Sequence, residues 1–144
     1  MSTRYLLDTN ICVYLLRGKY RMDEAIDNVG LDNCYISEIT AFELKVGAEL
    51  SKQRDNIDRS TGLEQFLSAI NILPITNAID TAAKEKIRLR LCGTPLDDDF
   101  DLIIGSTAVS FGMVMVTENI KDFKNIKDIK IENWVASCKS NPSI

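Results

Sequence analysis

The sequence predicts an α/β fold of three layers, in which helices cover both faces of a short, mostly parallel central sheet. Three observations support this prediction. Apolar runs of strand length recur along the chain, capped helical stretches separate them, and no internal repeat interrupts the alternation. At 144 residues and 45% apolar composition, the chain is large enough to bury one core.

The first predicted strand is the apolar run 4–7. Thr9 and Asn10 can cap the helix that follows over 11–17, and Gly18 ends it. A strand followed at once by a helix is the pattern expected of a parallel sheet.

A short helix is predicted over 22–29, ending at Gly30, and a second strand over 34–36. Ser37 has the side chain of an N-cap for a helix over 38–50. The strand-to-helix pattern therefore occurs a second time.

Four apolar side chains share one face of that helix: Ile39, Phe42, Val46 and Leu50. Glu43 falls on the same face, four residues after Ile39 and three before Val46. We therefore expect this face to pack inward with a carboxylate in its middle, unless a shift of the helix turns Glu43 outward.

The middle of the chain is less regular. Residues 51–60 are polar and form either a loop or an exposed extension of the preceding helix. Thr61 and Glu64 fit a capping box that opens a short helix. The strand predicted over 72–75 contains Pro74, which favours an edge position or a strand end.

The last third contains two helices and two strands. Asn77 is the expected cap of a helix over 77–91, and a second helix spans 99–111. The apolar run 113–117 predicts a strand, and a short last strand is predicted over 129–131.

We expect one domain over 1–136 and a flexible tail over 137–144. No apolar run approaches the roughly 20 residues that a membrane span needs. Arg4 leads into too short an apolar stretch for a signal peptide. We therefore expect a soluble, cytoplasmic protein without a membrane partner.

Missing residue types narrow the chemistry. The chain has no histidine, which excludes Ser-His-Asp and Cys-His catalysis and histidine-based cleavage of RNA. Its four cysteines form no Cys-x-x-Cys pair, so a structural zinc site is not expected. Oxygen ligands alone favour Mg²⁺, for which Mn²⁺ can substitute.

The net charge of −4 is unlike that of a typical basic nucleic-acid-binding protein. It leaves room for an enzyme that acts on nucleic acid through a metal ion and a local basic patch. Residues 17–21, which include Arg17, Lys19 and Arg21, are the patch that we assign to the RNA backbone.

Three acidic residues adjoin apolar segments. Asp8 ends the first strand, Glu43 lies on the apolar helix face, and Asp101 precedes the apolar part of its helix. A buried carboxylate costs on the order of several kcal/mol unless a cation compensates it, and a bound divalent cation would explain all three. Alternatively, Asp8 is a helix N-cap and Asp101 is a first-turn acid favoured by the helix dipole.

The order of these motifs resembles the PIN domain, and most closely the VapC toxins of type II toxin–antitoxin systems. The resemblance runs from about residue 4 to residue 134. It rests on the segments Leu6 to Asn10, Thr40 to Leu44 with Gly47, Phe100 to Gly105, Val116 to Asn119 with Asp122 and Phe123, and Lys130 to Trp134. It implies a PIN-like fold and a Mg²⁺-dependent endoribonuclease.

By this resemblance, Asp8, Glu43 and Asp101 bind the metal ion, and Thr117 and Asn119 complete the catalytic set. A shift of one residue in the comparison would replace Asn119 by Glu118 as the fourth site residue.

The resemblance also implies an outer shell around the metal, with Thr9 and Asn119 in it. Asp98 is a further candidate for that shell. It belongs to the run Asp97 to Asp99, which is otherwise a solvated helix start.

The implied reaction is in-line attack of a metal-activated water on an RNA phosphodiester, which leaves 5′-phosphate and 3′-hydroxyl ends. The implied partners are the RNA substrate, an antitoxin on another chain, and a second copy of this chain in a homodimer. One or two metal ions, and transfer, ribosomal or messenger RNA as the target, are all compatible with the motifs.

Two other classes of acid-rich domain were weighed. A receiver domain needs an aspartate at the end of its third strand, where this chain has Thr76. A haloacid-type phosphotransferase needs an aspartate two residues after the first, where this chain has Asn10. A non-catalytic acidic module that binds a basic protein partner is the remaining alternative.

Overall fold

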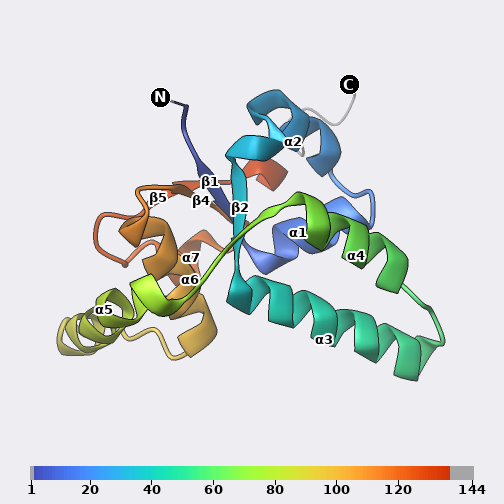
Figure 1. The fold of residues 1–144 in the computed structure, drawn as a ribbon. Helices are drawn as coiled ribbons and strands as arrows, with labels where there is room; N and C mark the ends of the chain where they lie inside the picture. The colour runs from blue at the N-terminus through green and yellow to red at the C-terminus, as the bar shows by residue number, and fades with distance from the viewer. Residues whose placement is uncertain (1, 137–144) are drawn as a thin grey trace.

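A five-stranded parallel sheet forms the centre of the protein (Figure 1), in a computed structural model that describes residues 2–136. The strand order is β3-β2-β1-β4-β5. Helices α1 to α4 lie on one side of the sheet and α5 to α7 on the other (Figure 1). The predicted three-layer α/β/α fold is therefore confirmed. The strands are β1 (Tyr5–Leu7), β2 (Cys34–Ser37), β3 (Asn71–Leu73), β4 (Val114–Val116) and β5 (Lys130–Glu132).

Seven α-helices and two short 3₁₀ turns connect the strands in the described part of the chain. The helices are α1 (Thr9–Leu16), α2 (Met22–Val29), α3 (Glu38–Asp55), α4 (Ser60–Ala69), α5 (Ile79–Leu91), α6 (Asp99–Ser110) and α7 (Ile120–Phe123). The 3₁₀ turns are Leu31–Asn33 and Thr76–Ala78. Strand β3, which Pro74 follows, lies at one edge of the sheet as predicted.

The core has two halves because successive residues of a strand point to opposite faces of the sheet. Leu7 and Val116 face α1 and α2 and belong to one buried cluster. Their neighbours Leu6 and Met115 belong to a second cluster, together with buried side chains of α5, α6 and α7. Strands that are buried on both faces read as continuous apolar runs, which is why they could be recognised in the sequence.

The cap predicted for the first helix at Thr9 and Asn10 is wrong, because α1 begins at Thr9 and its N-cap is Asp8. Two further predicted helix caps are wrong. Helix α4 begins at Ser60, one residue before the proposed capping box, and Asp58 accepts a hydrogen bond from the Ser60 amide at 2.9 Å. Asn77 lies in the 3₁₀ turn Thr76–Ala78 that precedes α5 and makes no cap. In both places a local turn satisfies the backbone just before the helix starts. The polar segment after residue 50 is a helical extension as far as Asp55.

The predicted inward face of α3 is also wrong. Phe42, Val46 and Leu50 are 55%, 49% and 50% exposed, and the buried positions of the helix include Thr40 and Leu44. The helix is rotated because Thr40 packs against the start of α1 and Leu44 enters the first core cluster. Glu43 is therefore half-buried next to the contact between α3 and the start of α1. It does not lie in the middle of a buried apolar stripe.

The predicted tail, 137–144, lies outside the described residues, and the domain boundary at residue 136 stays a prediction. Within residues 2–136, none of the helices combines the length and the apolar character needed to span a membrane.

Candidate active site

The carboxyl ends of the two central strands β1 and β4 bring Asp8 and Thr117 together. Strands β1 and β4 are neighbours in register, with Leu7 opposite Val116. Asp8 and Thr117, which follow them, therefore lie side by side, and the Asp8 amide donates to the Val116 carbonyl at 2.9 Å. This edge of a parallel sheet is where α/β proteins place their ligands.

Asp8 is 5% exposed and its two carboxylate oxygens are both engaged. Oδ1 accepts from the Thr9 amide at 2.8 Å, which makes Asp8 the N-cap of α1, and Oδ2 accepts from the Thr117 hydroxyl at 2.8 Å. Burial raises the pKa of Asp8, with smaller contributions from Glu43 and Asp122, while the bonds from Thr117 and Thr9 oppose the rise. Thr117 thus fixes the orientation of a carboxylate that is also a helix cap.

Glu43 is tied to the same helix start by Thr9. The Thr9 hydroxyl donates to Glu43 Oε1 at 2.6 Å and also lies 3.1 Å from the Thr40 hydroxyl. Thr9, which the sequence places in the outer shell of the site, therefore contacts Glu43 directly. Because Asp8 and Thr9 are consecutive, the first turn of α1 holds two of the three acids in place.

Asp101 lies in the first turn of α6, whose N-cap is Asp98. Asp98 Oδ1 accepts from the amides of Phe100 and Asp101 at 3.0 and 3.2 Å, so this oxygen is used in capping. Burial raises the pKa of Asp101 to about 7, and the charges of Asp98, Asp8, Asp122 and Glu43 each add to the rise. The three predicted acids therefore share one electrostatic field.

The two candidates for the fourth site residue differ in their contacts. Glu118 Oε1 accepts from the Tyr14 hydroxyl at 2.6 Å, and this bond raises the pKa of Tyr14 to about 12. The side chain of Asn119 makes no capping bond to α7. The backbone amide of Asn119 donates to the Thr117 hydroxyl at 3.0 Å. Asn119 is thus linked through Thr117 to Asp8, whereas Glu118 is linked to α1.

Asp122 is an acid that our sequence analysis did not assign to the site. It lies on α7, and its charge raises the pKa of both Asp8 and Asp101. It is exposed at the rim of a cavity of about 260 Å³ that Asp98, Asp101 and Lys121 also line. A helix of four residues is too short for periodicity to show which face it turns inward. The one signal was the buried neighbour, Phe123, which fixes where α7 lies.

A second cavity, of about 310 Å³, is lined by Glu43. Its walls are apolar and come from α1, α3 and α4, with Val13, Leu44 and Leu63 among them. Two basic side chains, Arg17 and Arg59, also line it. Glu43 therefore belongs to both the apolar groove and the carboxylate site.

The PIN domain family model matches residues 5–129 of the chain. The chain belongs to the PIN-domain family. This match spans every described strand except β5 and includes Asp8, Glu43, Asp101 and Asp122.

Within the family, this PIN domain is similar to proteins named VapC. It is 32% identical to the tRNA(fMet)-specific endonuclease VapC of Salmonella typhimurium over 91% of this chain and 98% of that protein. It is 34% identical to the ribonuclease VapC2 of Rickettsia felis over 90% and 97% of the two chains. The crystal structure of DNA-bound VapBC from Salmonella typhimurium matches with a TM-score of 0.80 at 31% identity, over 92% and 98% of the two chains.

The donor set of this PIN domain suits a hard divalent cation, because its side chains offer carboxylate and hydroxyl oxygens only. Among residues 2–136, no three Asp, Glu or Cys side chains converge closely enough to hold an ion as they stand. The chemistry of these side chains therefore fits Mg²⁺. Burial is the main cause of the raised pKa of Asp101, and repulsion from the neighbouring acids adds to it.

Proposed function

We propose that this PIN domain is a Mg²⁺-dependent endoribonuclease, the toxin of a toxin–antitoxin pair. The observation that carries the proposal is the group of acids at the carboxyl edge of the sheet, in which Asp101 has a pKa near 7 without a cationic partner among the described residues. The relatives named as VapC ribonucleases support RNA as the substrate class.

Asp8, Glu43 and Asp101 would hold the metal ion. A bound Mg²⁺ supplies an acidified water and neutralises charge that develops on the phosphate. Thr117 keeps Asp8 in one orientation through its bond to Oδ2, and Thr9 does the same for Glu43 through Oε1. Such supports reduce the reorganisation needed when a ligand arrives.

Asp101 is the residue on which a proton resides near neutral pH, because its pKa is about 7. A cation has to displace that proton, so we expect binding to be weaker at acidic pH. The backbone amide of Asn119 donates to the Thr117 hydroxyl, and Asp122 lines the same cavity as Asp101, so both residues are candidates to orient a water. We propose them as outer-shell residues, together with Asp98.

RNA is a polyanion, and the net charge of −4 works against its approach. The basic stretch 17–21 after α1 offers Arg17, Lys19 and Arg21 for its backbone. We propose that this stretch guides the RNA strand toward Glu43, since Arg17 lines the cavity that Glu43 also lines. We also propose a cytoplasmic location, where RNA is available as a substrate. The three free cysteines in the described chain suit that reducing compartment.

We propose that the antitoxin occupies the apolar groove beside Glu43. The solved complexes of relatives named VapBC support an antitoxin partner. An apolar segment would cover Val13, Leu44 and Leu63, and a basic side chain at its end would reach Glu43. Binding there would compete with a metal ion for a site carboxylate.

We also propose a homodimer. Large apolar side chains are exposed on α3 and α5, where a monomer in water would not gather them. They include Phe42, Val46, Ile87 and Leu91, of which Leu91 is 81% exposed. Light scattering of the purified chain tests the proposal, and a Leu91→Glu variant that leaves a dimer unchanged would show that this residue lies outside the interface.

An RNA cleavage assay tests the enzyme itself. The wild type should cut RNA with Mg²⁺ or Mn²⁺ and stop in EDTA, and Asp101→Ala should be inactive. Asp27→Asn, an exposed acid on α2, is the matched control and should cleave like the wild type. Cleavage that persists in EDTA, or that Asp101→Ala retains, would overturn the proposed metal-dependent nuclease. A wild type that cuts no RNA with either ion would favour the acidic binding module instead.

A further inference from the structure

Glu85 is a buried acid that the site does not use. It lies on α5 and is 8% exposed, and both its oxygens are bonded to Arg88 one turn later. Arg88 Nε donates to Oε1 and Nη2 donates to Oε2, each at 2.6 Å. This two-pronged pairing compensates the buried carboxylate and lowers the pKa of Glu85, with the Arg88 bonds as the main cause.

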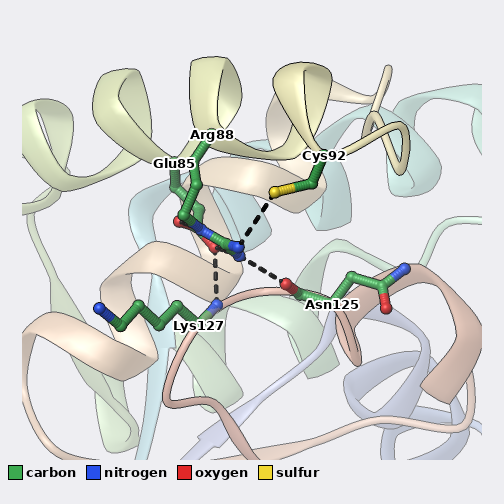
Figure 2. A network of polar contacts seen from close by, with 5 residues as sticks. All are labelled: Glu85, Arg88, Cys92, Asn125 and Lys127. Atoms are coloured by element: carbon green, nitrogen blue, oxygen red, sulfur yellow. Dashed lines mark hydrogen bonds and ion pairs between the residues drawn. The ribbon is translucent and has the colours of Figure 1, made fainter.

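The pair also holds a segment of chain far away in sequence. Glu85 Oε2 accepts from the Lys127 amide at 2.6 Å, and Arg88 Nη2 donates to the Asn125 carbonyl at 2.8 Å. Figure 2 shows both side chains directed from α5 toward this loop, with the weaker contact from Arg88 to Cys92 at their side. We call Glu85 and Arg88 together the α5 latch.

The loop held by the latch directly follows α7, which carries Asp122. Helix α7 has only four residues, and a helix of this length has no stability of its own. Asp122 is exposed, and it shares the acidic cavity with Asn125 and with Leu89, the neighbour of Arg88. The position of Asp122 therefore depends on what anchors the loop.

The inner anchor of that loop is a close contact with α6. A Cβ atom at Gly105 would lie 2.5 Å from Ile126 Cδ1 and 3.2 Å from Phe123 Cδ1, so the loop packs directly on the helix one turn after Asp101. This contact limits how near α7 can come to Asp101. The latch acts from the outer side and limits how far away it can move.

A restraint on the position of α7 is needed because the other negative charges of the site repel Asp122. Asp122 acts electrostatically on both Asp8 and Asp101, and like charges at this distance repel. Without a cation, this repulsion disfavours a position of the short helix close to Asp8 and Asp101. Two hydrogen bonds to backbone groups on the exit side of α7 resist a movement away from these acids.

We propose that the α5 latch is a positioning device, in which Glu85 and Arg88 hold Asp122 at the rim of the acidic cavity so that it contributes to metal binding. The inference rests on the proposed function, since it assigns Asp122 to the same metal site. Glu85 and Arg88 touch neither the ion nor the RNA in this account.

The test separates positioning from stability with two variants. Arg88→Met breaks the latch and leaves Glu85 buried without its partner, which should lower the melting temperature markedly. The double variant Glu85→Met/Arg88→Met breaks the latch without a stranded charge, so its melting temperature should return toward that of the wild type. Ile26→Val, a buried change on α2, is a modestly destabilised control remote from the latch.

Mn²⁺ binding to the RNA-free protein is measured by titration calorimetry, and amide exchange is followed over 120–127. We expect both latch variants to lose about tenfold in Mn²⁺ affinity, as for lost outer-shell supports, and to exchange faster over 120–127. Ile26→Val should bind Mn²⁺ like the wild type. A double variant that binds Mn²⁺ as tightly as the wild type would overturn the latch alone. A wild type that binds no Mn²⁺ would overturn the proposed function and the latch with it.

Discussion

Replacing Asp101 by asparagine should make the metal-free protein more stable at alkaline pH. The pKa of Asp101 rises from 3.8 to about 7 on folding, mainly because the carboxyl group is partly buried. Between these two values the folded state binds more protons than the unfolded state. The associated stability is therefore complete below about pH 4 and is lost as the pH rises through about 7.

The full shift corresponds to about 4 kcal/mol. Because Asp101 is only half-buried, solvent screening reduces the expected effect to roughly 2 kcal/mol. Asparagine has nearly the same shape and carries no charge at any pH. Relative to the wild type, Asp101→Asn should thus gain roughly 2 kcal/mol at pH 8 and close to nothing at pH 4, or about 7 °C in melting temperature for a chain of this size.

The assay is urea unfolding in EDTA at several pH values between 4 and 8, followed by circular dichroism. Asp27→Asn removes the same charge from an exposed position and should change the free energy of unfolding by less than about 0.5 kcal/mol at every pH. If Asp101→Asn is no more stable than the wild type at pH 8, or if its advantage does not depend on pH, then the charge of Asp101 is not what opposes folding.

Three further predictions follow from the same geometry. Mn²⁺ should raise the melting temperature of the wild type in proportion to the logarithm of its concentration, and it should have little effect on the melting temperature of Asp8→Asn. Thermal scans at several Mn²⁺ concentrations test this, and an equal rise in both proteins would remove Asp8 from the site. Thr117→Val should cost about 1–3 kcal/mol in urea unfolding at pH 7.5, because Asp8 Oδ2 loses its donor, and little at a pH where Asp8 is protonated; a loss independent of pH would indicate a packing defect instead. Gly105→Ala should cost about 1–3 kcal/mol through overlap with Ile126, and Gly105→Ala/Ile126→Val should recover part of it; a double variant that recovers nothing would contradict the close contact.

The parts of the fold that follow from local patterns could be predicted from the sequence. The strands are buried on both faces, so their apolar runs stand out, and Asp8 could be placed because it directly ends one of them. The inward face of α3 could not be read in the same way. Its apolar residues Phe42 and Val46 are exposed, and the buried side includes Thr40, whose role depends on a threonine of another helix.

Tertiary contacts likewise decided the rest of the site. Asp122 is an exposed residue on a four-residue helix, and within its own segment only its place beside Phe123 in the PIN-like motif distinguishes it from other surface acids. Its proposed role depends on two anchors. One is the neighbouring side chain of Phe123, which is buried in the core, and the other is the latch on α5, which is distant in sequence. Glu43 was assigned to the site for a reason that proved wrong, since the apolar stripe faces outward, yet its bond to Thr9 places it beside Asp8.

Asp8 caps α1 and Asp101 lies in the first turn of α6, and both positions are compatible with the proposed metal binding. A helix N-terminus offers amide donors and a positive dipole end, and both lower the cost of holding a carboxylate near other negative charges. Asp8 receives an amide and a hydroxyl bond at the start of α1, and Glu43, which is too far along α3 to gain from its dipole, receives the hydroxyl of Thr9 instead. Asp101 has only the helix start, and all the described influences on its pKa raise it. The least supported acid is therefore the one whose pKa lies near neutral, and under the proposed function a metal ion would have to displace its proton in order to bind.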